Sequence, residues 1–567
     1  MHAFTTLDIV VVIAYFLVML AIGISAMRAN RSVRDYFAGG NRIPWWVSGM
    51  TMYMANFSAW TFSGAAGFAY ETGWFAILYF AVWPPAYLVG TLLTARKWRR
   101  TRSVSPVEYT RTRFSPATQQ LLSWVIGTNF LLTAGVQLAA VCTLLAPVVG
   151  IDILALVAIT GTVILLYTFF GGIWAVSVTD VVQGIILLGI TMLMLPLAVQ
   201  LAGGFPAVLA AVPPLAMEHT YNGVHYDIHW LVSIFLIMTI GVAAGQAQRF
   251  YSVRDEKAAR RTGIFAAALF LTVPLIFGIP PLAARALWPD LSAVPFFAHA
   301  PTGNPRDLVF LALCLEALPA GLVGFFVAAM LAATMSTLSS VFNMVASIVA
   351  KDVYQGALRP AADDRSVLRV GRAASVGVGA AVTGLAVVFI ASPGGIFNAM
   401  QALYTLLNIP IVVPIAAGLL IRRASHQAAI VSVISGLATG MIGRWLLMLD
   451  FGPQFYLQFT VTLGSFLLTM HPRVAALLGR ASDAQRERLG TFFARLDTPV
   501  DADSEVGGEE GRYAPIVMAG WVTLLFAALL AALLVFAPDT GGKSIIAALA
   551  AFLACAGIGL RSLVRRR

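Results

Sequence analysis

Charged residues are scarce in this chain of 567 residues, where they make up 11% of the total against 59% for hydrophobic residues. A soluble globular protein carries about 25% charged residues, so this shortage excludes an ordinary soluble fold. Cysteine is almost missing too, and the three cysteines, Cys142, Cys314 and Cys555, lie far apart in apolar stretches. Their spacing excludes a disulfide framework and a paired-cysteine metal site.

The sequence contains fifteen long apolar runs, as a chain built from membrane-spanning helices requires. A helix needs about 20 apolar residues to cross the hydrocarbon core. The runs cover residues 7–27, 44–69, 73–95, 117–148, 152–171, 173–199, 229–248, 262–288, 318–350, 370–391, 395–421, 426–447, 454–472, 514–537 and 543–560. The first has no basic segment before it and is too long for a signal peptide, so we expect a retained helix. The predicted fold is an all-α integral membrane protein with about fifteen transmembrane helices.

The basic residues are divided unevenly between the connections of these runs. Alternate connections, beginning with 28–42 and ending with the tail 561–567, hold 33 of the 37 lysines and arginines. Basic connections mark the cytoplasmic side, so we expect the N-terminus outside and the C-terminus inside the cell. This orientation requires an odd number of spans and predicts a multi-pass protein of the cell (inner) membrane.

Two connections are unusually long. Residues 200–228, on the predicted outer side, contain several glycines and prolines and are expected to form a loop. Residues 473–513 are polar with an acidic, glycine-containing end, and we expect a mobile cytoplasmic linker that is too short for a catalytic domain.

Polar side chains occur inside two of the predicted spans, 173–199 and 44–69. Asp180 lies about seven residues, or roughly 10 Å, into a span, where an ionisable side chain is costly and indicates function. The alternative is a helix cap near the lipid headgroups. In the second run, Asn56 and Ser58 weaken the helix because their side chains compete for backbone hydrogen bonds. An interrupted helix frees carbonyl oxygens, with which transporters bind ions, whereas the alternative is hydrogen bonding between packed helices.

The ninth run has small residues at every fourth position, Ala329, Ala333 and Thr337, which lets another backbone approach closely. The hydroxyls of Ser336 and Thr337 lie beside the Ala333 carbonyl on such a helix. A hard cation prefers oxygen ligands, and these groups supply them without a buried negative charge. The alternative is that each hydroxyl bonds the carbonyl four residues before it.

Four stretches in order resemble the sodium:solute symporter family. They are Asp35–Trp46, Gly171–Gln183, Gln248–Arg260 and Ala333–Tyr354. The resemblance runs through about residues 5–472 and implies a transport core of two inverted repeats with five helices each. It implies an N-terminal helix and loop at 1–43, a core at 44–421 (repeats 44–199 and 229–421), two further helices at 422–472, the linker 473–513 and a helix pair at 514–567.

The resemblance places the sodium ion of this family between the second and ninth runs. The matching oxygens belong to the carbonyls of Met54, Phe57 and Ala333 and to the hydroxyls of Ser336 and Thr337. Asp180 matches an acid that supports the two hydroxyls.

The resemblance says less about the solute. The stretch at the helix break is similar to the proline carriers, but those carriers have an acid where this chain has Asn56. Gln401 falls where sugar carriers place a glutamine, whereas the amide of their sixth core helix corresponds here to a position near Ala243. For Gln246 and Tyr404, ordinary packing is the alternative. The candidate solute-binding residues are Asn56, Ser58, Trp60, Gln246, Gln401 and Tyr404.

Together these expectations predict a sodium-coupled symporter, not an enzyme, that imports a small organic solute such as a monocarboxylate or an amino acid by alternating access. Sodium is then a transported ion and not a prosthetic group, and no nucleic-acid partner is expected. The nearest alternative is a proton-coupled carrier of the same fold, and a more distant one is a transporter-like membrane sensor. A membrane enzyme would need His219, His225 and His229 to bind zinc, whereas solvated histidines are the simpler interpretation. The solute, the stoichiometry and the oligomeric state stay open.

Overall fold

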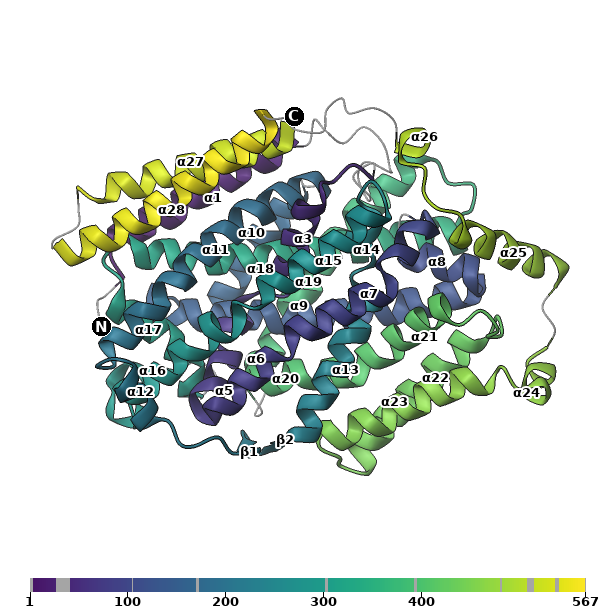
Figure 1. Cartoon of the computed structure of the whole chain (residues 1–567), viewed down its shortest axis with the longest axis horizontal. Coiled ribbons are helices and arrows are strands. Elements are labelled where there is room, and N and C mark those ends of the chain that lie inside the picture. Colours follow the sequence, from purple (N-terminus) through teal and green to yellow (C-terminus); the bar gives the residue numbers. More distant parts are fainter. Residues whose placement is uncertain are drawn as a thin grey trace.

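The computed structural model describes residues 4–26, 41–103, 106–169, 173–300, 304–391, 395–479, 482–506, 514–535 and 540–565. Parts of two stretches that carry the family resemblance, 35–40 and 171–172, lie outside these residues, as does 507–513 of the predicted linker. Helices make up almost all of the described chain and pack side by side in one elongated bundle (Figure 1).

Every predicted apolar run contains a helix. Eleven runs form one main helix each, namely α1 (Thr6–Ala26), α9 (Pro116–Val149), α10 (Ile153–Phe169), α11 (Ile173–Leu201), α13 (Ile228–Gly245), α18 (Leu322–Ser347), α19 (Asp364–Ile390), α22 (Ala428–Met441), α23 (Phe451–Leu468), α27 (Ala514–Leu533) and α28 (Thr540–Arg565). Eleven helical stretches of the described residues are long and apolar enough to cross a membrane, and Thr6–Met19 and Ile153–Leu165 are shorter apolar helices. The count of fifteen spans and the orientation of the termini stay predictions.

Four runs are interrupted. The second is divided into α3 (Trp45–Met54), α4 (Ala59–Phe62) and α5 (Gly64–Thr72), and the third into α6 (Trp74–Ala81) and α7 (Trp83–Thr101). The eighth contains α15 (Glu256–Phe270) and α16 (Ile279–Leu287) around a π-helical turn at Pro274–Gly278, and the eleventh contains α20 (Gly395–Leu403) and α21 (Ile409–Leu420) around another at Tyr404–Asn408. Shorter helices are α8 (Pro106–Arg113), α12 (Phe205–Ala211), α14 (Ala247–Tyr251) and α17 (Val309–Ala317).

The helices pack in two groups. The first group consists of α3, α7, α13 and α15, and the second of α9, α10, α18 and α19. Glycines let the backbones approach within each group, since a methyl group at Gly90 of α7 would lie 2.6 Å from the Thr239 carbonyl oxygen of α13. In the second group, a methyl group at Gly135 of α9 would lie 2.7 Å from Leu385 of α19. Helix α11 contacts both α3 and α18 and so lies between the groups.

The N-terminal helix is attached to the start of α18. The Asp8 carboxylate accepts hydrogen bonds from the backbone N–H groups of Gly321 and Gly324, both at 2.7 Å. A carboxylate stabilises the positive N-terminal end of a helix and satisfies N–H groups that have no partner inside it. A methyl group at Gly324 would meet the Asp8 backbone at 2.4 Å, so α1 lies directly against α18.

Residues 200–228 are more ordered than expected, because the loop contains α12 and an antiparallel hairpin of β1 (Glu218–Tyr221) and β2 (Val224–Asp227). Its turn residues, Asn222 and Gly223, have φ angles of 50° and 77°, as a tight hairpin turn requires. The Tyr226 hydroxyl donates to the Asn398 side-chain oxygen of α20 at 2.6 Å, and the Asn398 amide donates to the Asn222 carbonyl at 3.2 Å. The hairpin is therefore tied to α20.

The segment 473–513 is also more ordered than predicted. It forms α24 (Pro472–Leu477), α25 (Asp483–Asp497) and α26 (Ala502–Val506), and the side chains of Phe492, Leu496 and Val506 are buried. Residues 482–506, which we call the strap, are therefore largely helical and packed against the bundle, and the mobility of this segment stays a prediction. Figure 1 shows α25 and α26 along the side of the bundle away from the hairpin.

Candidate functional site

The predicted interruption of the second span is confirmed. Helix α3 ends at Met54 and α4 begins at Ala59, while the Asn56 side chain donates to the Met52 carbonyl at 2.8 Å. The Ser58 hydroxyl accepts from the Trp60 N–H at 3.3 Å and caps α4, as serine commonly does at a helix N-terminus. Ser58 therefore serves the local backbone.

The break crosses α18. The Thr337 hydroxyl lies 3.3 Å from the Phe57 carbonyl oxygen and 3.2 Å from the Ala333 carbonyl oxygen. Three residues earlier on α18, the Thr334 hydroxyl accepts from the Ala59 N–H at 2.8 Å, which fixes α4 against this helix. Oxygens from both predicted repeats thus meet beside one threonine.

The donor set fits a small hard cation. Two carbonyls and one hydroxyl are uncharged oxygen ligands of the kind that such ions accept. Met54 lies at the end of α3, where its carbonyl accepts from the Phe57 N–H at 3.0 Å. The Ser336 side chain lies outside the described residues, although its backbone belongs to α18. The Thr337 hydroxyl also makes the bond to its own helix that was the alternative to a ligand role.

Asp180 lies deep in the bundle. Asp180 is 1% exposed and lies seven residues after the start of α11, within the helix. Arg249 of α14 is close enough to interact electrostatically with this carboxylate. Asp180 therefore connects α11 with the element that follows α13, and support of the α18 hydroxyls stays a prediction.

Three of the predicted solute residues gather around a tyrosine that sequence reasoning missed. The Tyr87 side chain of α7 lies near the Asn56 and Gln246 side chains and near Tyr404. Tyr87 is almost fully buried. A tyrosine inside an apolar span needs a partner for its hydroxyl, and this requirement was the available signal.

Two further candidates present buried polar atoms that have no hydrogen-bond partner among the described residues. Gln401 of α20 is 1% exposed, and neither its amide nitrogen nor its oxygen is satisfied. The Trp60 ring stacks on Phe397 with centroids 5.8 Å apart, and its indole N–H has no partner. The buried Tyr79 hydroxyl is unsatisfied too. Such groups are costly and rare in folded proteins, so a cluster of them is typical of a ligand site.

The zinc alternative is wrong for the part of the chain that the structure describes. His219 and His225 lie on paired strands, where His219 is opposite Tyr226 and His225 is opposite Thr220. Adjacent residues of a strand point to opposite faces, so these two histidines do as well. His229 belongs to α13, and the described residues contain no group of three possible His, Cys, Asp or Glu ligands.

The family model named Sodium:solute symporter family matches residues 36–436, which is more than half of the chain. The chain belongs to the sodium:solute symporter family. It is therefore a multi-pass membrane transporter and not an enzyme, and sodium is its transported coupling ion.

Curated relatives of this symporter carry several solutes in their names. It is 28% identical to the rat (Rattus norvegicus) sodium/myo-inositol cotransporter 2 over 494 residues, which cover 78% of this chain and 70% of the relative. It is 24% identical to the sodium/sialic acid symporter SiaT of Proteus mirabilis (strain HI4320) over 467 residues, which cover 78% and 91%.

Two solved structures support the fold. A Na+-coupled sialic acid symporter matches this symporter with a TM-score of 0.71 at 21% identity, over 82% of this chain and 97% of the other. A nucleobase-cation-symport-1 family transporter matches with a TM-score of 0.53 at 15% identity, over 80% and 98%.

Proposed function

We propose that this symporter imports a small neutral solute together with sodium, which binds where the broken second span crosses α18. The supporting observation is the Thr337 hydroxyl, which lies 3.3 Å from one carbonyl of the break and 3.2 Å from one of its own helix. The proposed ligands are the Met54, Phe57 and Ala333 carbonyls with the Ser336 and Thr337 hydroxyls, and Asp180 supports them from α11.

The chemistry of the solute residues favours an uncharged ligand rich in hydroxyl groups over the monocarboxylate or amino acid that the sequence suggested. The described candidates are amides, phenols and an indole, namely Asn56, Trp60, Tyr87, Gln246, Gln401 and Tyr404. None of them would neutralise a buried carboxylate, and an unpaired buried charge is costly. The amides can donate and accept, as hydroxyl groups require. The myo-inositol named for one relative is such a solute.

Sodium would drive accumulation by favouring one conformer. An ion shifts a conformational equilibrium only if it binds one state more tightly, and a site built from both repeats changes when the repeats move. A membrane potential of 100 mV contributes about 2.3 kcal/mol per charge, and a tenfold gradient adds about 1.4 kcal/mol. One sodium ion therefore supports roughly 500-fold accumulation of a neutral solute.

Uptake into proteoliposomes tests the proposal. Vesicles of purified protein receive a sodium gradient, a proton gradient or neither, with radiolabelled polyols, sugars, monocarboxylates and amino acids outside. We expect concentrative uptake of a neutral polyol or sugar with sodium only. Uptake driven equally by protons alone would overturn the sodium assignment, and uptake restricted to carboxylates would overturn the solute assignment.

A further inference from the structure

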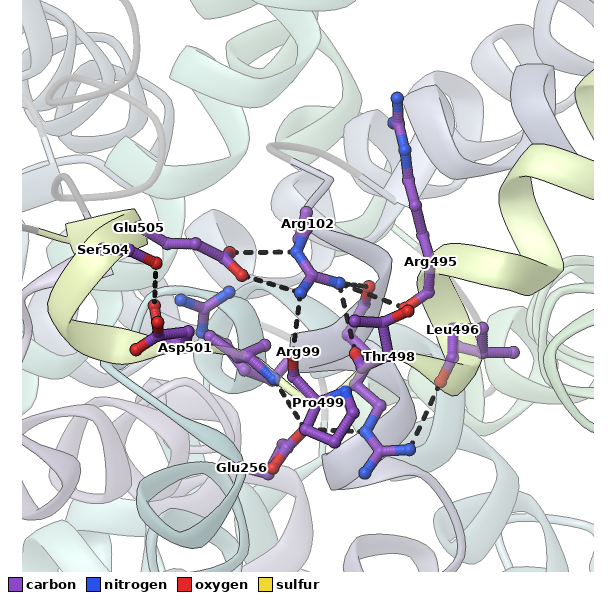
Figure 2. Close-up of polar contacts among 12 residues, drawn as sticks. Arg99, Arg102, Glu256, Arg495, Leu496, Thr498, Pro499, Asp501, Ser504 and Glu505 are labelled. Carbon is purple, nitrogen blue, oxygen red and sulfur yellow. Dashed lines mark hydrogen bonds and ion pairs between the residues drawn. The ribbon is translucent and has the colours of Figure 1, made fainter.

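The strap is held against the body of the protein by arginines at the end of α7. Arg102 donates to both carboxylate oxygens of Glu505, at 2.7 and 2.9 Å, and also to the carbonyls of Arg495 and Pro499, each at 3.1 Å. Figure 2 shows the Arg102 guanidinium between Glu505 of α26 and the residues at the end of α25. The last carbonyls of a helix carry partial negative charge, which a guanidinium stabilises.

The conformation of Arg102 itself depends on these contacts. Its φ angle is 55°, in the left-handed region that a residue with a bulky side chain rarely adopts. Such a conformation persists where surrounding contacts hold it, and the strap supplies several of them. Contacts from α7 and from the strap together therefore fix the backbone where the two segments meet.

The strap also contacts the first helix group at two other places. The Glu256 carboxylate of α15 accepts from the Arg100 side chain at 2.6 Å and from the Val500 N–H of the strap at 3.1 Å. Just before α3, Arg42 donates to the Val506 carbonyl at 3.0 Å. The strap therefore joins the ends of α3, α7 and α15 on the face of the protein predicted to be cytoplasmic.

The other end of the strap contacts elements outside that group. The Phe492 ring packs on Tyr109 of α8 with centroids 5.7 Å apart, and the Arg113 guanidinium lies over the Phe493 ring at 5.2 Å. Helix α8 leads directly into α9, which belongs to the second group. The strap thus contacts the first helix group directly and reaches the second group through α8.

In this conformation α3 of the first group lies directly against α11, the helix between the groups. A methyl group at Gly184 of α11 would lie 2.7 Å from the Met50 sulfur of α3, so the two helices touch. Alternating access requires one group to move against the other, which would separate helices of this kind. A segment fastened both to the first group and to α8, which continues into α9, opposes that movement.

We propose that the strap is a brace that stabilises the conformation closed at the predicted cytoplasmic face, and that it must release Arg102 when this face opens. The inference rests on the alternating access of the proposed function. Because its fastenings are ionic and near the surface, salt weakens the brace.

The rate at which a buried cysteine is labelled measures opening of this face and requires neither sodium nor solute. Met50→Cys is introduced with Cys555→Ser, and an impermeant thiol reagent is applied to inside-out vesicles. We expect Arg102→Glu to accelerate labelling at least about fivefold, which is the change in an equilibrium that loss of one ion pair of about 1 kcal/mol produces. The reciprocal pair Arg102→Glu with Glu505→Arg should restore the parent rate.

Arg486→Glu is the matched control, since the ion pair between Arg486 and Asp483 lies within α25 and leaves the body untouched. We expect the parent rate in this variant. Raising the salt from 0.1 to 1 M shortens the screening length from about 10 to about 3 Å and should accelerate labelling more in the parent than in Arg102→Glu, which has already lost one of the ion pairs.

The proposal would be refuted if Arg102→Glu were labelled at the same rate as the parent although trypsin cut its strap faster. The strap would then be detached without opening of the cytoplasmic face. The same acceleration in Arg486→Glu would overturn it too. If Arg102→Glu does not fold, Glu505→Gln, which changes the strap alone, takes its place. Labelling must then be faster in Glu505→Gln than in the parent, and an equal rate rejects the proposal. Loss of sodium-driven uptake with the predicted labelling pattern would instead refute the proposed function alone.

Discussion

Replacing Thr337 by valine tests the sodium site with little change in volume. The substitution removes the one described hydroxyl that lies between the Phe57 and Ala333 carbonyls. A hydrogen bond or polar contact to a charged group contributes about 1.5–3 kcal/mol. Loss of one such ligand should therefore weaken sodium binding about 10- to 150-fold.

The half-saturating sodium concentration for uptake into proteoliposomes measures this effect, and the rise in melting temperature on adding sodium measures it without transport. Thr337→Ser keeps the hydroxyl and should stay close to the parent. Thr191→Ala is the control, because the buried Thr191 hydroxyl donates to the Leu187 carbonyl of its own helix at 2.6 Å. Ser336→Ala tests the other predicted hydroxyl. Unchanged sodium dependence in both Thr337→Val and Ser336→Ala, or an equal shift in the control, would refute the site.

Three further predictions concern stability, solute binding and pH. Asp8→Ala removes the carboxylate that accepts from two N–H groups at the start of α18, so it should lower the free energy of unfolding by about 1–2 kcal/mol, measured by denaturation. Gln401→Leu removes two buried atoms without partners, so it should raise the melting temperature of the solute-free protein while weakening solute binding, and a lower melting temperature would contradict this. Hydrogen bonds with arginines lower the pKa values of the Glu505 and Asp497 carboxyl groups. The contribution of these two carboxylates to strap attachment is therefore complete above the ordinary carboxyl pKa of about 4, and it disappears as the pH falls through the lowered pKa values. Trypsin sensitivity of the strap should therefore be constant from about pH 5 to 8.

Much of the helical framework could be predicted because its signals are local. Apolar runs of membrane-spanning length each became helix, and the polar side chains near Asn56 marked the break between α3 and α4. The approach of Thr337 to Phe57 needed the family resemblance as well, since no local pattern relates residues 280 positions apart.

The missed features depend on contacts between distant segments. The strap looked like a solvated linker because its polar groups have partners, such as Arg102 for Glu505 and Glu256 for the Val500 N–H, that lie hundreds of positions away in the sequence. Tyr87 was missed because its neighbours Asn56 and Gln246 belong to other segments of the chain. The hairpin, in contrast, carried a readable signal, since Asn-Gly at 222–223 favours a two-residue turn.

The attachment of the hairpin to Asn398 offers a way to influence the transport cycle from the surface of the protein. Asn398 lies three residues before Gln401 on α20, so the two belong to the same stretch of helix. We therefore expect an antibody fragment bound to the hairpin to restrict the movement of this part of α20.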